Sequence, residues 1–421
     1  MSKQEFDVAV VGAGFAGMYL LHRLRKLGFR ARVIEAGSDV GGTWYWNRYP
    51  GARVDIESMQ YSYQFDEELQ QEWQWSERYS PQPEILQYAG HVADRFDLRR
   101  DIQFDTRVAA ATYDEKSARW TLEAEDGSKT VARFFVMATG CLSKPNWPQI
   151  DGLDSFVGPT YHTALWPHEK IDFTGKRVAV IGTGSSAIQS IPVIADEAAE
   201  VFVFQRTANY AIPANNAPLD QKYEHEVKSR YAEFRAEAKQ TPPGIHGRFR
   251  QGKALEATAE ERQAEYEQRW ETGGLSFMGA YGDLIFDQEA NDTAAEFVRN
   301  KIRGLVEDPD IAELLCPKNI IGGKRLCVDT NYFSTYNRDH VHLIDVEAQP
   351  IEAITPTGVR AQGKNFEVDA LVIATGFDAM TGALTQVDIK GRNDASLQKR
   401  WADGPTSYLG LAMADFPNLF T

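Results

Sequence analysis

The chain carries one local pattern twice: a short apolar run, a cluster of glycines and a stretch with helical spacing. The apolar runs cover residues 8–11 and 178–181, and the clusters that follow them read Gly12-Ala-Gly14-Phe-Ala-Gly17 and Gly182-Thr-Gly184-Ser-Ser-Ala187. A strand, a tight glycine turn and a helix in this order are typical of a βαβ unit that binds a dinucleotide. The repetition predicts an α/β protein with two Rossmann-like nucleotide-binding domains.

The first copy is followed by an acidic residue, Glu35, at the end of the next apolar run. It stands 23 residues after Gly12 (35 minus 12), where a carboxylate accepts from a ribose hydroxyl. A carboxylate about 4 Å from a 2′-phosphate also costs roughly 4 kcal/mol per charge pair at intermediate dielectric. The first site is therefore expected to bind FAD or NAD and to reject NADP.

The second copy has no acid at this place and continues as Gln205-Arg206-Thr207. A guanidinium matches a phosphate in shape and charge, so Arg206 predicts that the second site prefers NADPH. The alternative is that Arg206 is a solvated surface arginine. Further contacts with NADPH are predicted for the residues of the turn itself, namely Gly182, Thr183, Gly184, Ser185 and Ser186.

Length and composition limit the other possibilities. A chain of 421 residues suggests two or three domains, and no stretch approaches the roughly 20 apolar residues of a membrane span. A formal net charge of -15 argues against nucleic acid or an anionic membrane as partner. The N-terminus lacks the pattern of a signal peptide, which favours a cytoplasmic location. Cys141, Cys316 and Cys327 form no CxxC pair, so neither a disulfide framework nor a metal site is predicted.

Changes in the residue pattern along the chain predict the order of the domains. Between residues 219 and 306, charged segments with helical spacing indicate a helical insertion, interrupted by a loop at 241–247. Strands are expected again at 341–346 and 370–374. The predicted parts are an FAD-binding domain in two pieces, an NADP-binding domain in two pieces and the insertion: 1–145 (FAD, first), 146–215 (NADP, first), 216–318 (insertion), 319–369 (NADP, second) and 370–421 (FAD, second).

Residues 41–58 hold more aromatic side chains than a plain connection needs. Such flat side chains suit a dry pocket beside an isoalloxazine ring. The small residues of Ala138-Thr-Gly140 and Ala374-Thr-Gly376 are expected to bring backbone close to a cofactor. Besides the glycines of the first motif and Glu35, cofactor contacts are predicted for Phe15, Gly42, Thr43, Trp44, Trp46, Tyr61, Gly140, Thr375 and Gly376.

A segment between the two glycine motifs is more specific. Phe156-Val-Gly158-Pro-Thr-Tyr-His162-Thr-Ala-Leu-Trp166-Pro167 matches the FxGxxxHxxxWP fingerprint of Baeyer-Villiger monooxygenases. The segments 41–53, 138–140, 324–325, 336–339 and 374–382 also resemble that family, in the same order. The resemblance covers essentially the whole chain and is closest to the group that acts on phenylacetone, steroids and other bulky ketones.

This resemblance implies a reaction and roles for several residues. NADPH reduces FAD, O2 adds at flavin C4a, and the peroxide attacks a ketone to give an ester or lactone. Arg325 matches the family's catalytic arginine, and Asp55 matches the carboxylate that positions it. Lys324 and Thr207 match residues at the NADP phosphate, whereas His162 is expected to serve coupling between domains. Without the resemblance, Lys324 and Arg325 would be loop charges, and Asp55 would cap a helix near Glu57.

The resemblance also implies that the family's chain continues beyond Thr421, so the second part of the FAD-binding domain is expected to be incomplete. Three alternatives remain open. The first is a sister flavin monooxygenase that oxidises nitrogen or sulfur atoms. The second is a non-catalytic nucleotide-binding chain, and the third is an NADPH oxidase that releases hydrogen peroxide.

Overall fold

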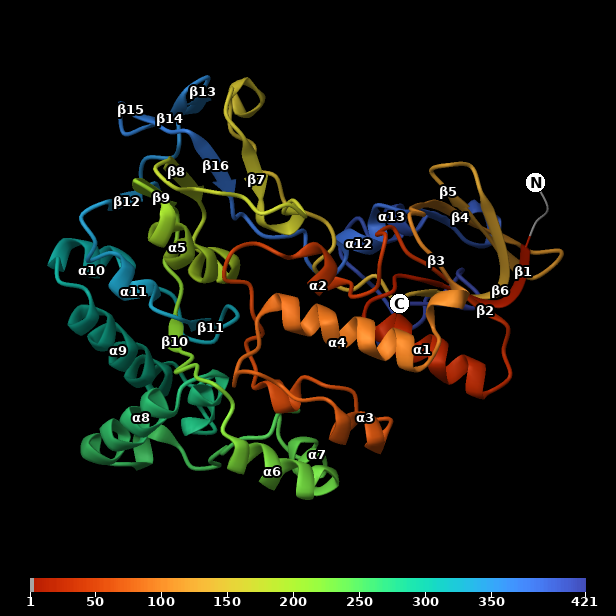
Figure 1. Ribbon diagram of the computed structural model, residues 1–421, viewed down its shortest axis with the longest axis horizontal. Helices are drawn as coiled ribbons and strands as arrows, with labels where there is room; N and C mark the ends of the chain where they lie inside the picture. Colours follow the sequence, from red (N-terminus) through yellow and green to blue (C-terminus); the bar gives the residue numbers. More distant parts are fainter. Residues whose placement is uncertain (1–3) are drawn as a thin grey trace. The chain divides into compact units, whose positions relative to one another are not determined.

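The computed structural model describes residues 4–421, which divide into two compact units. Unit 1 holds the described residues up to Arg48, together with Pro83–Asn146 and Phe377–Thr421, and unit 2 holds Tyr49–Gln82 and Trp147–Gly376. Figure 1 shows the helices and strands of both units along the chain. Each unit contains one of the two glycine motifs.

Unit 1 is built on one mixed sheet. Its strands are β1 (Gln4–Val11), β2 (Ala31–Ile34), β3 (Ile102–Gln103), β4 (Val108–Asp114), β5 (Arg119–Ala124), β6 (Lys129–Met137), β17 (Asp388–Lys390) and β18 (Leu419–Phe420). They follow the order β17-β4-β5-β6-β1-β2-β3, and β18 pairs with β6 beside this path. β1 runs parallel to β2 and β6, whereas β4, β5 and β6 form an antiparallel meander.

Helices cover this sheet because β1 is apolar on both faces in its second half. Val8, Ala9 and Val10 are buried, as expected for a central parallel strand. The helices of unit 1 are α1 (Phe15–Lys26), α2 (Thr43–Trp46), α4 (Gln82–Arg95, which begins at the last residue of unit 2), α12 (Gly382–Thr385) and α13 (Leu397–Arg400). α1 buries Met18 and Leu21 in the same core cluster as Ala89 and Ala93 of α4.

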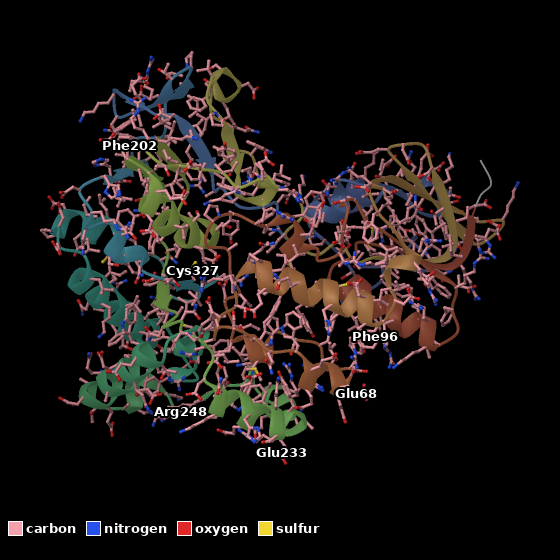
Figure 2. The ribbon with its side chains drawn as sticks, viewed as in Figure 1. Glu68, Phe96, Phe202, Glu233, Arg248 and Cys327 are labelled. Carbon is pink, nitrogen blue, oxygen red and sulfur yellow. The ribbon has the colours of Figure 1, made fainter. Side chains whose placement is uncertain are left out.

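Unit 2 is built on a fully parallel sheet of five strands. These are β7 (Thr160–His162), β8 (Arg177–Ile181), β9 (Glu200–Gln205), β12 (Val341–Asp345) and β16 (Ala370–Ile373), in the order β12-β9-β8-β16-β7. Figure 2 labels Phe202 on β9, where its ring stacks on His342 of β12 with the centroids 5.0 Å apart. Two smaller sheets accompany it: β10 (Ala211–Pro213) with β11 (Cys327–Asp329), and β13 (Ala353–Thr355) with β14 (Gly358–Ala361) and β15 (Lys364–Glu367).

The predicted helical insertion is helical in the structure, although more broken than expected. The helices of unit 2 are α3 (Glu67–Glu72), α5 (Ser185–Glu197), α6 (Gln221–Ser229), α7 (Tyr231–Ala238), α8 (Ala259–Thr272), α9 (Gln288–Leu305), α10 (Pro309–Leu315) and α11 (Tyr332–Thr335). α6 and α7 meet at Arg230, whose φ and ψ of -133° and 32° end one helix before the next begins. The loop expected at 241–247 lies between α7 and α8.

Two boundaries differ from the predicted ones. The second FAD-binding part is predicted to start at residue 370, but β16 pairs with β7 and β8 inside the unit 2 sheet, and unit 1 resumes only at Phe377. Residues 49–82 are predicted to belong to the first FAD-binding part, whereas they pack within unit 2. In both cases the deciding contacts are made by residues far apart in sequence, which no local pattern reports.

Candidate functional site

The first glycine motif forms a tight turn between β1 and α1. Gly12 has a φ of +106°, and a Cβ added to it would lie 2.6 Å from the carbonyl oxygen of Ala138. A Cβ on Gly17 would lie 1.9 Å from the carbonyl oxygen of Gly12. Both positions therefore need glycine on steric grounds. Gly14 is the N-cap of α1 and contributes no side-chain cap, which leaves the N–H groups of the first turn for a ligand.

Glu35 lies beside this turn, at the end of β2. Only 5% of the residue is exposed, and its carboxylate accepts hydrogen bonds from the backbone N–H of Ala13 at 2.6 Å and of Gly37 at 2.8 Å. Burial raises the pKa of Glu35, and the two backbone donors act against that shift. The structure thus shows a carboxylate that supports the turn itself, a contact that the sequence analysis did not foresee.

The aromatic segment after Glu35 continues against the glycine turn. α2 starts at Thr43, which is exposed, while Trp44 is buried and Trp46 is half-buried. A Cβ on Gly42 would lie 2.7 Å from the Cα of Gly14, so the two backbones are in close contact. Phe15 is half-buried at the start of α1. Tyr61, which the sequence analysis grouped with these residues, belongs to unit 2.

The second glycine motif repeats the turn in unit 2. Gly182 has a φ of +109°, and its added Cβ would lie 2.6 Å from the carbonyl oxygen of Ala374. The hydroxyl of Thr183 donates to the carbonyl of Thr207 at 2.9 Å, and the amide of Asn209 donates to the carbonyl of Thr183 at 2.7 Å. No sequence pattern marks Asn209 as part of this site. These bonds tie the turn to the segment that carries Arg206.

The α5 helix starts at Ser185 with Gly184 as an N-cap that offers no side-chain bond. Ser185 and Ser186 are its first two residues and are half-buried.

Each glycine turn faces a short segment that follows a neighbouring strand, after β6 in unit 1 and after β16 in unit 2. Each segment contains a glycine with positive φ: +68° at Gly140 and +77° at Gly376. Thr375 is half-buried beside Gly376.

Arg206 follows β9 directly and is exposed. It borders a cavity of about 320 Å³ in unit 2, together with Thr207 and Lys318. Within residues 4–421 its guanidinium makes no hydrogen bond or ion pair, so its charge is available to a ligand. Acidic side chains, Glu313, Asp345 and Glu347, line other parts of the same cavity.

The two residues predicted to be catalytic form an ion pair. Nη2 of Arg325 lies 2.6 Å from Oδ2 of Asp55, although 270 residues separate them. The Asp55 side chain is 6% exposed and the Arg325 side chain 63% exposed. Burial raises the pKa of Asp55, and the guanidinium of Arg325 acts to lower it. The alternative that Asp55 caps a helix is wrong, because the short helix at Ser58–Gln60 has Glu57 as its N-cap.

A third side chain, which the sequence analysis missed, completes this pair. Gln189 of α5 donates from Nε2 to Oδ1 of Asp55 at 3.0 Å, and its Oε1 accepts from the hydroxyl of Tyr49 at 2.9 Å. Burial raises the pKa of Tyr49 well above its ordinary value, so this hydroxyl stays a donor. No local motif marks a glutamine in the second turn of a helix. Lys324, next to Arg325, is exposed.

The fingerprint segment lies along the edge strand of the unit 2 sheet. His162 ends β7 and is 2% exposed; its Nδ1 accepts from the backbone N–H of Ala164 at 3.0 Å. Trp166 is buried against Tyr161 and Phe173. The remaining fingerprint residues are half-buried: Phe156, Gly158 and Pro167.

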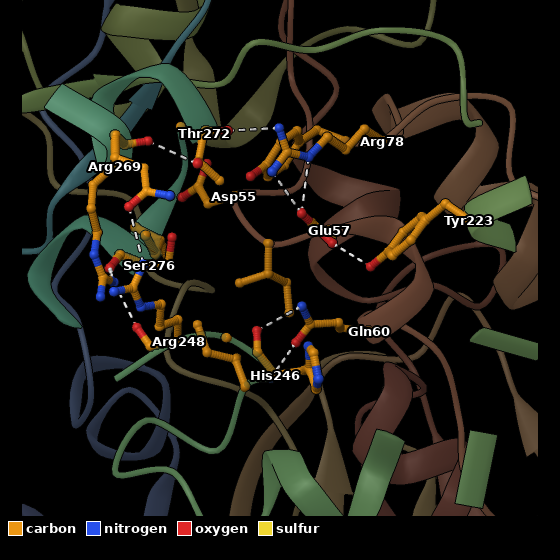
Figure 3. A pocket seen from close by; sticks show the side chains of 17 residues that line it. Asp55, Glu57, Gln60, Arg78, Tyr223, His246, Arg248, Arg269, Thr272 and Ser276 are labelled. Carbon is orange, nitrogen blue, oxygen red and sulfur yellow. Dashed lines mark hydrogen bonds and ion pairs between the residues drawn. The ribbon is translucent and has the colours of Figure 1, made fainter. Parts of the chain in front are cut away.

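A cavity of about 280 Å³ in unit 2 adjoins Asp55 and Ile56. Figure 3 shows its polar side: Nη2 of Arg78 lies 2.7 Å from the carboxylate of Glu57, which also accepts from the hydroxyl of Tyr223 at 2.7 Å. Ile56, Ile245 and Leu275 supply apolar lining. The cavity therefore combines apolar walls with side chains that can hydrogen-bond a ligand.

Among residues 4–421 no three His, Cys, Asp or Glu side chains stand close enough to hold a metal ion. None of the helices found there is long and apolar enough to cross a membrane.

Comparisons with known proteins agree with this arrangement. Residues 9–257 match the family described as pyridine nucleotide-disulphide oxidoreductase, although the sequence has no CxxC pair. A Baeyer-Villiger monooxygenase from Pseudooceanicola batsensis is 43% identical over 99% of this chain and 77% of its own. A phenazine N-monooxygenase from Lysobacter antibioticus is 42% identical over 99% of this chain and 78% of its own. The structure of an oxidized steroid monooxygenase bound to NADP is 54% identical, with a TM-score of 0.95 over 99% of this chain and 80% of that one.

The fold and the paired glycine turns thus define a flavoprotein monooxygenase with two dinucleotide-binding units. Within that class, the chain belongs to the Baeyer-Villiger monooxygenases.

Proposed function

We infer that this chain converts ketones to esters or lactones with NADPH and O2, and that Arg325 and Asp55 carry out the catalytic work. It is an FAD-containing, NADPH-dependent Baeyer-Villiger monooxygenase. The observation that carries the residue assignment is the ion pair itself: a buried carboxylate holds a guanidinium that is more than half exposed. A charge that serves only the core would be covered, whereas this one is presented to the surface of unit 2.

The two glycine turns fit the two nucleotides. In unit 1 the turn is free of side chains where a pyrophosphate would lie, since a Cβ at Gly12 or Gly17 would collide with backbone. We propose that this turn and the segment around Trp44 hold FAD. In unit 2 we propose that the Gly182 turn, Ser185 and Ser186 hold the pyrophosphate of NADPH, and that Arg206, Thr207 and Lys324 hold its 2′-phosphate.

Bound FAD, once reduced by NADPH, would activate O2, of which one atom is inserted beside the carbonyl and the other leaves as water. The chain's own residues supply charge and position. The guanidinium of Arg325 carries a positive charge, so it favours negative charge on an oxygen that it faces. The buried carboxylate of Asp55 holds the guanidinium of Arg325 in one orientation and balances its positive charge.

We propose that the natural ketone is bulky, cyclic or aryl. The 54% identity with a steroid monooxygenase supports this, together with cyclohexanone and cyclopentanone monooxygenases among relatives at 40% and 39% identity. A relative at 41% identity is an acetone monooxygenase, so a small ketone is also a substrate within the family. A panel of acetone, cyclohexanone, phenylacetone and a steroid ketone tests the proposal, because kcat/KM for acetone should then be the lowest of the four.

Oxidation of a heteroatom is the second candidate, because the phenazine N-monooxygenase, at 42% identity, is as similar to this chain as the cyclohexanone and acetone monooxygenases, at 40% and 41%. An aromatic N-heterocycle and a thioether, assayed beside the ketones, distinguish the two. Ester formation at least tenfold faster than N-oxide formation is the expected result. The reverse order would reassign the substrate.

Arg325→Ala tests the catalytic assignment. We expect NADPH to reduce the flavin at nearly the normal rate, while ester formation falls by a factor of about 100 or more, because a charge-assisted contact is lost at the reacting oxygen. Arg338→Ala is a matched control: it breaks another Arg–Asp pair of unit 2, in which Nη1 of Arg338 lies 2.7 Å from Oδ1 of Asp196. Ester formation at a normal rate in Arg325→Ala would disprove the assignment.

A further inference from the structure

Gln189 makes a full set of hydrogen bonds around the catalytic pair. Besides the bonds to Asp55 and Tyr49, its Nε2 lies 3.2 Å from the carbonyl oxygen of Arg53, and its Oε1 lies 3.4 Å from the backbone N–H of Arg53. The residue is 7% exposed. A buried amide that is satisfied on both sides fixes the groups around it, because every alternative arrangement leaves a polar atom unpaired.

The orientation of this amide follows from its partners. An ionised Asp55 can only accept, so the atom facing it must be the NH2 group, and Oε1 then faces the hydroxyl of Tyr49. Asp55 consequently uses Oδ1 for Gln189 and Oδ2 for Arg325. With one donor on each oxygen, the carboxylate cannot rotate without breaking a buried bond.

The backbone is shaped to allow this contact. Gly51 has a φ of +77°, and a Cβ added to it would lie 2.2 Å from the carbonyl oxygen of Gln189. The chain before Asp55 therefore lies directly on the second turn of α5. Gln189 is four residues after Ser185, so both side chains lie on the same face of the helix that starts at the glycine turn.

We propose that Gln189 is a positioning residue, which holds the Asp55 carboxylate so that Arg325 faces the reacting oxygen, and which links the pair to the nucleotide turn at the start of α5. This inference rests on the proposed function of Arg325 and Asp55. Neither the resemblance nor the fingerprint marks this residue. Without its N–H donor, Asp55 keeps Arg325 as its one side-chain partner, and the guanidinium is free to turn toward solvent.

Two substitutions separate positioning from mere packing. Gln189→Leu keeps the approximate volume and removes both polar groups. Gln189→Glu places a second carboxyl beside Asp55, and burial together with the like charge raises the pKa of such a group. When protonated at low pH, Glu at this position can still donate to Asp55; when ionised at higher pH, it repels it.

The main readout is the fraction of consumed NADPH that appears as ester rather than as hydrogen peroxide. For Gln189→Leu we expect near-normal flavin reduction and a fall in this fraction of about tenfold at all pH values, as for the loss of a hydrogen bond to a charged group. For Gln189→Glu we expect recovery at acidic pH and a progressive loss as pH rises. Ser190→Ala, on the adjacent buried position of α5, is the control and should leave the fraction unchanged.

A second readout is independent of turnover. Loss of the donor raises the pKa of Asp55 further above that of the unfolded chain. A group with a raised folded-state pKa contributes stability at low pH that is lost as pH rises through that value. The difference in melting temperature between FAD-loaded wild type and FAD-loaded Gln189→Leu should therefore grow as pH rises from about 4 to 8. Adding Asp55→Asn to both proteins should abolish this trend.

The outcomes are distinguishable from failure of the proposed function. If Arg325→Ala still forms ester, the catalytic assignment itself is wrong. If Arg325→Ala loses ester formation while Gln189→Leu keeps the normal fraction, only the role of Gln189 is overturned. Identical pH profiles for Gln189→Leu and Gln189→Glu would also overturn it, since packing alone does not depend on protonation.

Discussion

The two units contain the same strand, glycine turn, helix and strand, in residues 8–35 of unit 1 and in residues 178–205 of unit 2. Equivalent residues differ in number by 170, since 182 minus 12 and 205 minus 35 both equal 170. The pairing also agrees. Val11 is opposite Ile34 and Met137 in unit 1, and Ile181 is opposite Phe204 and Ile373 in unit 2. Even the added Cβ of the first glycine would lie 2.6 Å from a carbonyl oxygen in both turns. The backbone of the turn is thus determined by steric contacts that the two units share.

The side chains at equivalent positions differ. At the position of Glu35, unit 2 has Gln205, which is also buried but uncharged. Gln205 donates to the carbonyl of Leu314 at 2.7 Å, and its Oε1 has no hydrogen-bond partner among residues 4–421. Arg206 then follows it. Tyr19, which is 39% exposed, becomes the buried Gln189. The proposed function thus places a pyrophosphate at the same turn in both units. It assigns the choice of nucleotide, and the contacts that the helix supports, to single side chains around that turn.

The third position of the motif gives the largest expected effect. Gly17→Ala places a Cβ 1.9 Å from a backbone oxygen, which cannot move without opening the turn, so we expect a loss of more than about 3 kcal/mol and little bound flavin. Its counterpart Ala187→Gly should cost only about 1 kcal/mol, the helix propensity difference. Flavin content per chain and thermal unfolding measure both. Normal flavin content in Gly17→Ala would mean that the two turns are more alike than the contacts indicate.

Arg206→Ala tests the difference in charge. We expect KM for NADPH to rise by about 10- to 100-fold, the value of a charge-assisted hydrogen bond to phosphate, while KM for NADH changes less than about threefold. Lys318→Ala is the control in the same cavity, because the Lys318 side chain is 85% exposed and already lies 3.4 Å from Glu347. Equal changes for both nucleotides would show that Arg206 does not contact the 2′-phosphate.

The sequence was sufficient to predict these βαβ units because each is specified locally, by apolar runs, glycines and a helical pattern within about 30 residues. The pairing of Arg325 with Asp55 was predicted only through the resemblance to the family. The sequence did not predict the roles of Gln189, Tyr49 and Asn209. These roles depend on partners up to 140 residues away, and no characteristic spacing marks a single glutamine, tyrosine or asparagine. The meander of β13, β14 and β15 was also not predicted.

The position of Glu35 was predicted and its structural contact was not. A ribose-binding carboxylate and a carboxylate that supports the turn occupy the same place, at the end of the second strand, and sequence pattern alone does not distinguish them. The distinction comes from the Ala13 N–H, which lies 2.6 Å from the carboxylate. The equivalent residue Gln205 accepts no such bond from Thr183 within the described hydrogen bonds.

Glu35→Gln gives the smallest effect and isolates that contact. Both oxygens of the Glu35 carboxyl can accept from a backbone donor in either protonation state, because a hydroxyl oxygen also accepts. The amide offers one acceptor and turns its NH2 toward the other N–H, so we expect a loss of about 1 kcal/mol. Because burial raises the pKa of Glu35, its contribution to stability is greatest at low pH and is lost as pH rises through the raised value. The difference in melting temperature between wild type and variant should therefore narrow from acidic toward neutral pH. A difference that widens instead would mean that the ionised carboxylate is the preferred partner of the Ala13 N–H, and that the bond outweighs the cost of burying the charge.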